Sequence, residues 1–178
     1  ILEAQNILVS LVESNPVNLG YRGLLCYTYL ELWDYSYKDA QDLKTIESIA
    51  QSTRALNVSG AEGYFCEATR LYLIGRNSEA KVTVESLLNS SSQFSLLPIV
   101  YYLRGNLLVA ENDHLQGLAF LEKAAELWPN WNRPYIAIAR AKAAKNEFND
   151  AAKNYQSVLS RNKEHYEAML GLGILNYR

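Results

Sequence analysis

The sequence predicts an all-α protein, an α-solenoid in which antiparallel helix–turn–helix units stack side by side. Small residues recur at Ala68, Gly105, Ala139 and Gly173, with spacings of 37, 34 and 34 residues. A period of that length is typical of repeated pairs of helices. Between the breaks, apolar residues follow the 3.6-residue period of a helix. The breaks are short and polar, which predicts that consecutive helices run antiparallel.

Two further sets of residues follow the same period. Aromatic or large apolar residues stand four places before each small residue, at Tyr64, Tyr101, Tyr135 and Met169. A second small residue stands twelve places after each of the first three, at Ala80, Gly117 and Ala151. Two helices can cross closely only where side chains are small. We therefore expect the two small residues of a unit to lie against each other, with the large residues filling the wider gaps.

In chain order, the predicted helices cover 1–14, 18–33, 40–57, 61–74, 78–89, 97–111, 114–127, 133–145, 149–161 and 165–177. Turn residues separate them, for example Gly75 as a helix terminator with Ser78 as a cap. Residues 18–58 form one oversized hairpin with a longer linker around residues 34–37, whose register within the repeat the pattern leaves open.

On these residues the chain resembles the tetratricopeptide repeat family, whose unit is a helix–turn–helix of 34 residues. The best unit runs from Pro98 to Trp131 and places the family's pattern on Tyr101, Gly105, Gly117, Leu121, Ala124 and Pro129. The resemblance implies one array over residues 1–178 that winds into a right-handed superhelix. Its parts are atypical hairpins over 1–60, repeats over 61–97, 98–131 and 132–165, and a half repeat over 166–178. We interpret the chain as a fragment of a longer protein.

In such arrays the first helix of each repeat lines a concave face that receives partners. Carried over to this chain, the predicted partner-binding residues are Phe65, Tyr72, Tyr102, Asn106, Arg133, Ile136, Arg140 and Leu170. They combine aromatic and apolar anchors with Asn and Arg, which suit an extended peptide or a partner helix. The alternative is that these side chains pack inside the protein itself.

Composition argues against several other functions. The net charge is −2, from 17 basic and 19 acidic residues, which gives no field to attract nucleic acid. No apolar run reaches the ~20 residues that span a bilayer. Cys26 and Cys66 lack metal-binding or redox spacing and are expected to be buried free thiols. His114 and His165 fall at turns without further ligands nearby, so no metal or cofactor is expected.

Aromatic residues are dense before residue 40. Tyr21, Tyr27, Tyr29, Tyr35 and Tyr37 gather there with Trp33. A base-stacking platform is one interpretation, but few basic residues accompany the rings. Aromatic packing is the interpretation we favour.

No phosphate-binding, nucleophile-elbow or zinc-protease motif occurs, so we expect no enzyme. The predicted function is a protein–protein interaction scaffold that binds a peptide or a partner subunit through the concave face. The alternative is a regulatory domain that senses a peptide and controls an attached output domain. A cytoplasmic location is favoured, and segments outside this sequence could attach the protein to a membrane-associated assembly. The pattern does not predict an oligomeric state.

Overall fold

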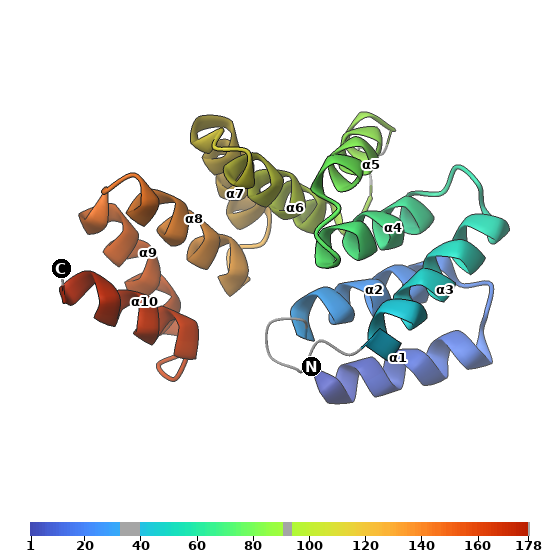
Figure 1. The fold of residues 1–178 in the computed structure, drawn as a ribbon. Helices are drawn as coiled ribbons and strands as arrows, with labels where there is room; N and C mark the ends of the chain where they lie inside the picture. The colour runs from blue at the N-terminus through green and yellow to red at the C-terminus, as the bar shows by residue number, and fades with distance from the viewer. Residues whose placement is uncertain (33–39, 91–93, 178) are drawn as a thin grey trace. The chain divides into compact units, whose positions relative to one another are not determined.

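The computed structural model describes residues 1–32, 40–90 and 94–177 and folds them entirely into helices and turns (Figure 1). The helices are α1 (Leu2–Ser14), α2 (Leu19–Leu32), α3 (Ala40–Leu56), α4 (Ala61–Leu73), α5 (Asn77–Ser90), α6 (Leu97–Ala110), α7 (His114–Leu127), α8 (Asn132–Ala144), α9 (Phe148–Arg161) and α10 (Tyr166–Asn176). The predicted all-α class of helix–turn–helix repeats is confirmed. Every predicted helix end that falls on described residues lies within one residue of the observed end. The predicted linker at 34–37, and with it Trp33, Tyr35 and Tyr37, lies outside the described residues.

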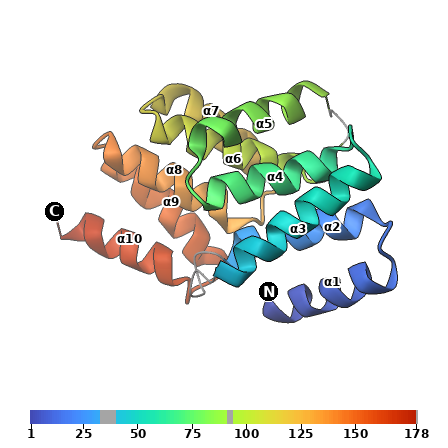
Figure 2. The same ribbon diagram turned by 45° about the vertical axis from the view of Figure 1, so that its right-hand side comes forward.

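The chain divides into two compact units. The first unit runs from Ile1 to Leu103 and holds α1 to α5 with the start of α6. The second runs from Arg104 to Arg178 and holds the rest of α6 with α7 to α10. Each unit is built from helical hairpins, for example α4–α5 in the first and α8–α9 in the second (Figures 1 and 2). The single continuous array stays a prediction.

One kind of turn joins the first helix of a repeat to the second, and it recurs three times. The residues in the left-handed conformation are Gly75 (φ 76°), Asn112 (φ 65°) and Asn146 (φ 63°). The next amide donates back across the turn, from Arg76 to Leu71, from Asp113 to Leu108 and from Glu147 to Lys142, at 2.9–3.0 Å. Glycine, and less readily asparagine, tolerates this conformation. The predicted terminator Gly75 is confirmed, but Ser78 is not the cap, because α5 already begins at Asn77.

A second kind of turn leads from the second helix of a repeat to the first helix of the next. It begins at Asn15, Asn57, Trp128 and Asn162, after α1, α3, α7 and α9. At each place this residue donates its amide to the carbonyl four residues earlier, at 2.9–3.1 Å. Its carbonyl accepts from the amide three residues later, at 3.0–3.1 Å. The shared hydrogen bonds identify α1 and α3 as second helices and α2 and α4 as first helices of their repeats.

The turns also give the register that the sequence left open. Counted from the turn, Cys26 of α2 takes the place held by Ala68 in α4 and Ala139 in α8. In α3, Ile46 takes the place of the small Ala151, and Ala50 that of the large Tyr155. All of these side chains are buried. The first full hairpin therefore keeps a small residue on its first helix but reverses large and small on its second.

Inside a repeat, the small residues let the two helix backbones touch. A Cβ atom on Gly105 would lie 2.6 Å from Leu121 Cγ and 2.9 Å from the carbonyl oxygen of Gly117. A Cβ atom on Gly117 would lie 2.7 Å from Val109 Cγ2 and 3.0 Å from the carbonyl oxygen of Gly105. Both separations are far below ordinary van der Waals contact. The predicted meeting of the two small residues is confirmed in this repeat.

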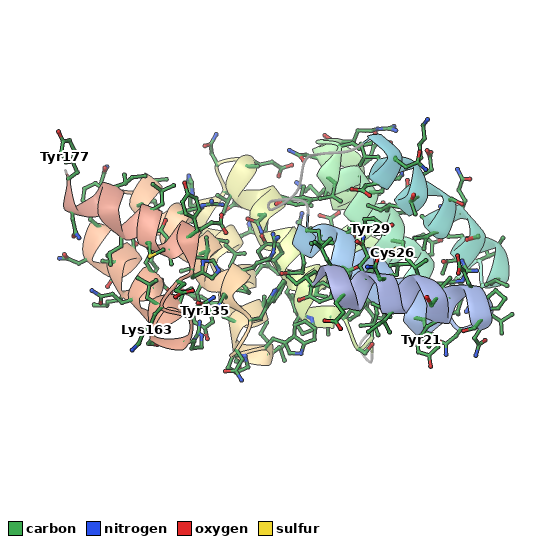
Figure 3. The ribbon with its side chains drawn as sticks, turned by 90° about the horizontal axis from the view of Figure 1, so that it is seen from below. Tyr21, Cys26, Tyr29, Tyr135, Lys163 and Tyr177 are labelled. Carbon is green, nitrogen blue, oxygen red and sulfur yellow. A yellow bond between two sulfur atoms is a disulfide. The ribbon has the colours of Figure 1, made fainter. Side chains whose placement is uncertain are left out.

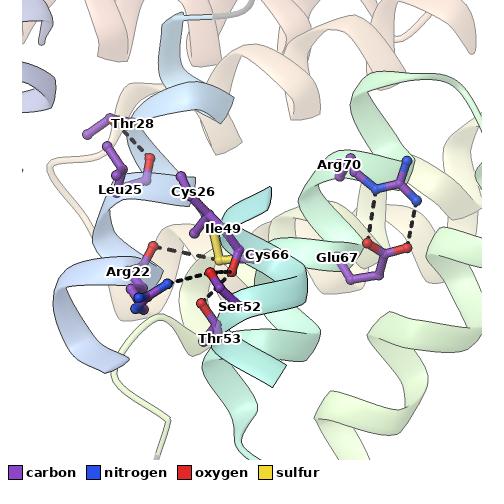
Figure 4. The surroundings of a disulfide bond; sticks show 10 residues. All are labelled: Arg22, Leu25, Cys26, Thr28, Ile49, Ser52, Thr53, Cys66, Glu67 and Arg70. Carbon is purple, nitrogen blue, oxygen red and sulfur yellow. Dashed lines mark hydrogen bonds and ion pairs between the residues drawn. A yellow bond between two sulfur atoms is a disulfide. The ribbon is translucent and has the colours of Figure 1, made fainter. Parts of the chain in front are cut away.

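The cysteines form a disulfide, so the expectation of two free thiols is wrong (Figure 4). Cys26 on α2 and Cys66 on α4 have Cα atoms 5.3 Å apart, within the range that a disulfide requires. They are 40 residues apart in sequence, which suggested two unrelated positions. In the structure both lie where the first helices of consecutive repeats pack together, and both are fully buried.

Candidate partner-binding face

The predicted partner-binding residues are distributed over both units. In the first unit are Phe65, Tyr72 and Tyr102; in the second are Asn106, Arg133, Ile136, Arg140 and Leu170. They lie on α4, α6, α8 and α10, which are the first helices of consecutive repeats. The structure therefore keeps them on equivalent helices, and their joint role in partner binding stays a prediction.

In the first unit this face is largely internal. Phe65 has no exposed surface, and its ring centroid lies 5.6 Å from that of Phe94. Cys66, the next residue, is bonded to Cys26 of α2. Tyr102 is buried and Tyr72 is half-buried. The packed side chains here follow the alternative that the sequence left open, in which aromatic residues stabilise the repeat stack from within.

Residues at one repeat position differ strongly in exposure. Phe65, Tyr102, Ile136 and Leu170 occupy equivalent places on their helices, and their exposed fractions are 0%, 7%, 3% and 49%. The sequence period gives these positions equal weight. Their environments differ because a side chain between repeats is covered only where a neighbouring helix lies over it. Only Leu170 of this set presents substantial apolar surface.

The second unit carries an exposed ion pair on the same face. Arg140 Nη2 of α8 lies 2.6 Å from Glu167 Oε1 of α10, with exposed side-chain fractions of 63% and 20%. Arg133 and Ile136, which precede Arg140 on the same side of α8, are buried, and Asn106 is half-buried. We define the candidate face as Arg140, Glu167 and Leu170. It offers a charged group of each sign beside an apolar side chain.

Tyr155 of α9 supports this face from behind. A Cβ atom on Gly171 of α10 would lie 2.3 Å from Tyr155 Cζ, so the ring packs directly against the α10 backbone. Burial raises the pKa of the Tyr155 phenol; the Glu167 carboxylate adds to the rise and the Arg140 guanidinium opposes it. The phenol is therefore neutral at physiological pH and acts as a rigid support. A hollow of about 320 Å³, lined in part by Tyr155, Gly171 and Ile174, lies beside it.

The described residues contain neither a cluster of metal-ligating side chains nor a helix that could span a membrane. Among residues 1–32, 40–90 and 94–177, no three His, Cys, Asp or Glu side chains gather as a metal site would require. In the same part of the chain, none of the helices combines the length and the apolar character needed to cross a bilayer.

The ten helices and their two recurring turns define a helical-repeat protein over the residues that the structure describes. No protein-family model matches the sequence, and no curated protein matches it. Solved structures do match. The TPR protein TTC0263 of Thermus thermophilus aligns with a TM-score of 0.73 and 12% identity, over 98% of this chain and 89% of that one. YrrB, described as a TPR protein with an unusual peptide-binding site, aligns with a TM-score of 0.60 and 16% identity, over 96% and 82%.

A third match is human IFIT1, solved as a dimer with m7Gppp-AAAA. Its TM-score is 0.73 at 16% identity, over 97% of this chain and 42% of that one. At such low identities the matches show the fold. The chain has the tetratricopeptide-repeat fold, and the resemblance found in its sequence is confirmed at that level.

Proposed function

We propose that this chain is an interaction scaffold that binds a peptide or a partner subunit through the first helices of its repeats. The observation that supports this proposal most directly is the Arg140–Glu167 ion pair with the exposed Leu170 beside it. A guanidinium has five N–H donors, so Arg140 can bind a carboxylate of the partner while it stays near Glu167. Leu170 supplies apolar surface for an anchoring side chain. The fold shared with a protein that has a peptide-binding site supports this function.

The chemistry of the face favours a peptide over nucleic acid. Contact with a phosphate backbone needs clustered unpaired cations, whereas Arg140 lies against Glu167 and the net charge of the chain is −2. IFIT1 is seen with a capped RNA, but the identity of 16% transfers only the fold. We therefore expect a segment with one apolar anchor and one acidic group. The remaining predicted residues, among them Tyr72 and Asn106, would extend the contact along the repeats.

The test selects peptides from a displayed random library on the 178-residue chain and measures their affinities by calorimetry. Arg140→Glu and Leu170→Asp should each weaken binding by about tenfold or more, since each removes a central contact. Lys153→Glu is the matched control, because Lys153 is also an exposed cation in an ion pair, with Asp150 on α9. It should change affinity by less than about twofold.

Two results would contradict the proposal. One is a library from which no peptide is selected on the folded chain. The other is a set of peptides that bind the Arg140 and Leu170 variants as tightly as the unaltered protein. If the selected peptides carry no acidic residue, only the role assigned to Arg140 is refuted.

A further inference from the structure

The disulfide lies inside the first unit. Cys26 of α2 and Cys66 of α4 have no exposed surface, and their chain neighbours Leu25 and Phe65 are 2% exposed or less. The Sγ atom of Cys66 lies 3.6 Å from the carbonyl oxygen of Arg22, one turn before Cys26 on α2 (Figure 4). Figure 3 shows Cys26 among the side chains of this unit. Neither sulfur atom is therefore accessible from solvent in the folded chain.

The bond uses every cysteine of the chain and is specific to one junction between repeats. The sequence contains two cysteines, and the bond joins both. Their helices, α2 and α4, pack together as the first helices of consecutive repeats, which brings the two Cα atoms to 5.3 Å. Other residues take these two places in the other repeats, namely Ala68, Gly105, Ala139 and Gly173 for Cys26, and Leu24, Leu103, Ala137 and Gly171 for Cys66. The bond is therefore an addition to the ordinary packing of repeats.

Formation of this bond requires access to the sulfur atoms. The thiolate of one cysteine attacks a sulfur atom of a disulfide donor and releases one donor thiol. The thiolate of the other cysteine then attacks the mixed disulfide and releases the second donor thiol, so that the chain loses two protons and two electrons and the donor is reduced to two thiols. A donor cannot be attached to a sulfur atom that has no exposed surface. The exchange therefore takes place while the chain is folding, before α2 and α4 have packed.

We propose that this chain folds in an oxidising compartment, where a disulfide donor joins Cys26 to Cys66 before their helices pack. In a reducing cytosol, glutathione and thioredoxin keep the thiols of an unfolded chain reduced. Both cysteines would then be enclosed as thiols when folding is complete. Because burial also shields the finished bond from reductants, the bond is a permanent cross-link between the repeats α2–α3 and α4–α5 and not a redox switch. This location differs from the cytoplasmic one that the sequence favours.

The first experiment determines where the protein is found and whether its cysteines are bonded. Cells of the organism that makes the protein are fractionated and denatured in the presence of N-ethylmaleimide, which blocks every free thiol. After reduction, a maleimide-linked polymer labels the cysteines that were bonded. The protein should be found in the extracytoplasmic fraction and should carry two labels. Recovery from the cytosol in either redox state, or from any fraction without label, would overturn the proposal.

The second experiment tests whether the bond is a permanent cross-link. The oxidised 178-residue chain is incubated with dithiothreitol in buffer or in urea that unfolds it, and the remaining disulfide is measured by the same labelling. Reduction should be slower by about a hundredfold or more in the folded chain, because the sulfur atoms react only in molecules that have opened.

The control for the effect of urea on thiol chemistry is an exposed thiol. Val82→Cys, combined with Cys26→Ser and Cys66→Ser, should react with maleimide at similar rates in buffer and in urea, because Val82 is 64% exposed. Equal rates of reduction for the folded and the unfolded chain would overturn the proposal, because the redox state would then follow the compartment that the protein occupies and not the one in which it folds.

Discussion

Alanine at Gly105 should destabilise the second unit, whereas alanine at Gly173 should not. Both glycines occupy the same place in their repeats and both lie within helices. In each, alanine gains up to about 1 kcal/mol of helix propensity. The environments differ, because a Cβ atom on Gly105 meets Leu121 and the backbone of Gly117, while one on Gly173 meets open space.

The size of the effect follows from what can move. Leu121 is fully buried, so its Cγ atom at 2.6 Å cannot turn away into solvent, and the Gly117 oxygen at 2.9 Å belongs to a helix backbone. Forcing an extra methyl group into a packed contact costs about 1–3 kcal/mol. Because the propensity gain is common to both variants, their unfolding free energies should differ by about 1–3 kcal/mol. Gly105→Leu should be worse than Gly105→Ala.

The assay is urea unfolding followed by circular dichroism at low protein concentration. The expected order of midpoints is Gly173→Ala highest, then the unaltered chain, then Gly105→Ala. Hydrogen exchange of the α7 amides gives a local measure, because they should lose protection only in the Gly105 variant. Equal midpoints for the two alanine variants would refute the claim that close backbone contact at Gly105 holds this repeat together.

Three further predictions concern single features of the fold. The folded chain should show no titratable thiol, and two reactive thiols in the native protein would contradict the disulfide. Reduction or Cys26→Ala should lower the unfolding free energy by about 3–4 kcal/mol, because the bond joins cysteines 40 residues apart. Burial raises the pKa of the Tyr155 phenol in the folded protein, so the phenol of the unfolded chain ionises first as the pH rises. The unfolding free energy should therefore fall above about pH 10. Tyr155→Phe should reduce this fall, measured by urea unfolding at alkaline pH. Gly75→Ala should lower the melting temperature by the equivalent of about 1 kcal/mol, because only glycine adopts its φ of 76° without cost.

Much of this fold could be predicted from the sequence because contacts inside a repeat are local. Gly105 and Gly117 are twelve residues apart and meet across one tight turn. Residues that contact each other within a repeat therefore lie close together in the sequence, and the same residue types recur in each repeat. The turns at Asn112 and Asn146 are harder to predict than the turn at Gly75. All three residues take the left-handed conformation, but asparagine indicates it less strongly than glycine does.

The first hairpin escaped prediction for two physical reasons. Seven residues separate α2 from α3, whereas three separate α8 from α9, and α2 and α3 (14 and 17 residues) are longer than α8 and α9 (13 and 14 residues). Cys26 therefore stands 42 residues before Ala68 and breaks the period. In addition, α3 places Ile46 where the pattern expects a small residue. Two packed helices require a total side-chain volume that fills the space between them, so a large and a small side chain can exchange positions without loss of packing. The disulfide could not be predicted because Cys26 and Cys66 are 40 residues apart in sequence. They meet only because they lie on α2 and α4, the first helices of consecutive repeats, which pack together.

Exposure is the property that a repeated sequence cannot supply. Phe65 and Leu170 have the same place in the repeat, yet one is fully buried and the other is half exposed. The exposure of a side chain between repeats depends on what packs over it, and residue type alone does not specify that. For this reason we propose the partner contact at Arg140, Glu167 and Leu170 instead of spreading it evenly over α4 to α10.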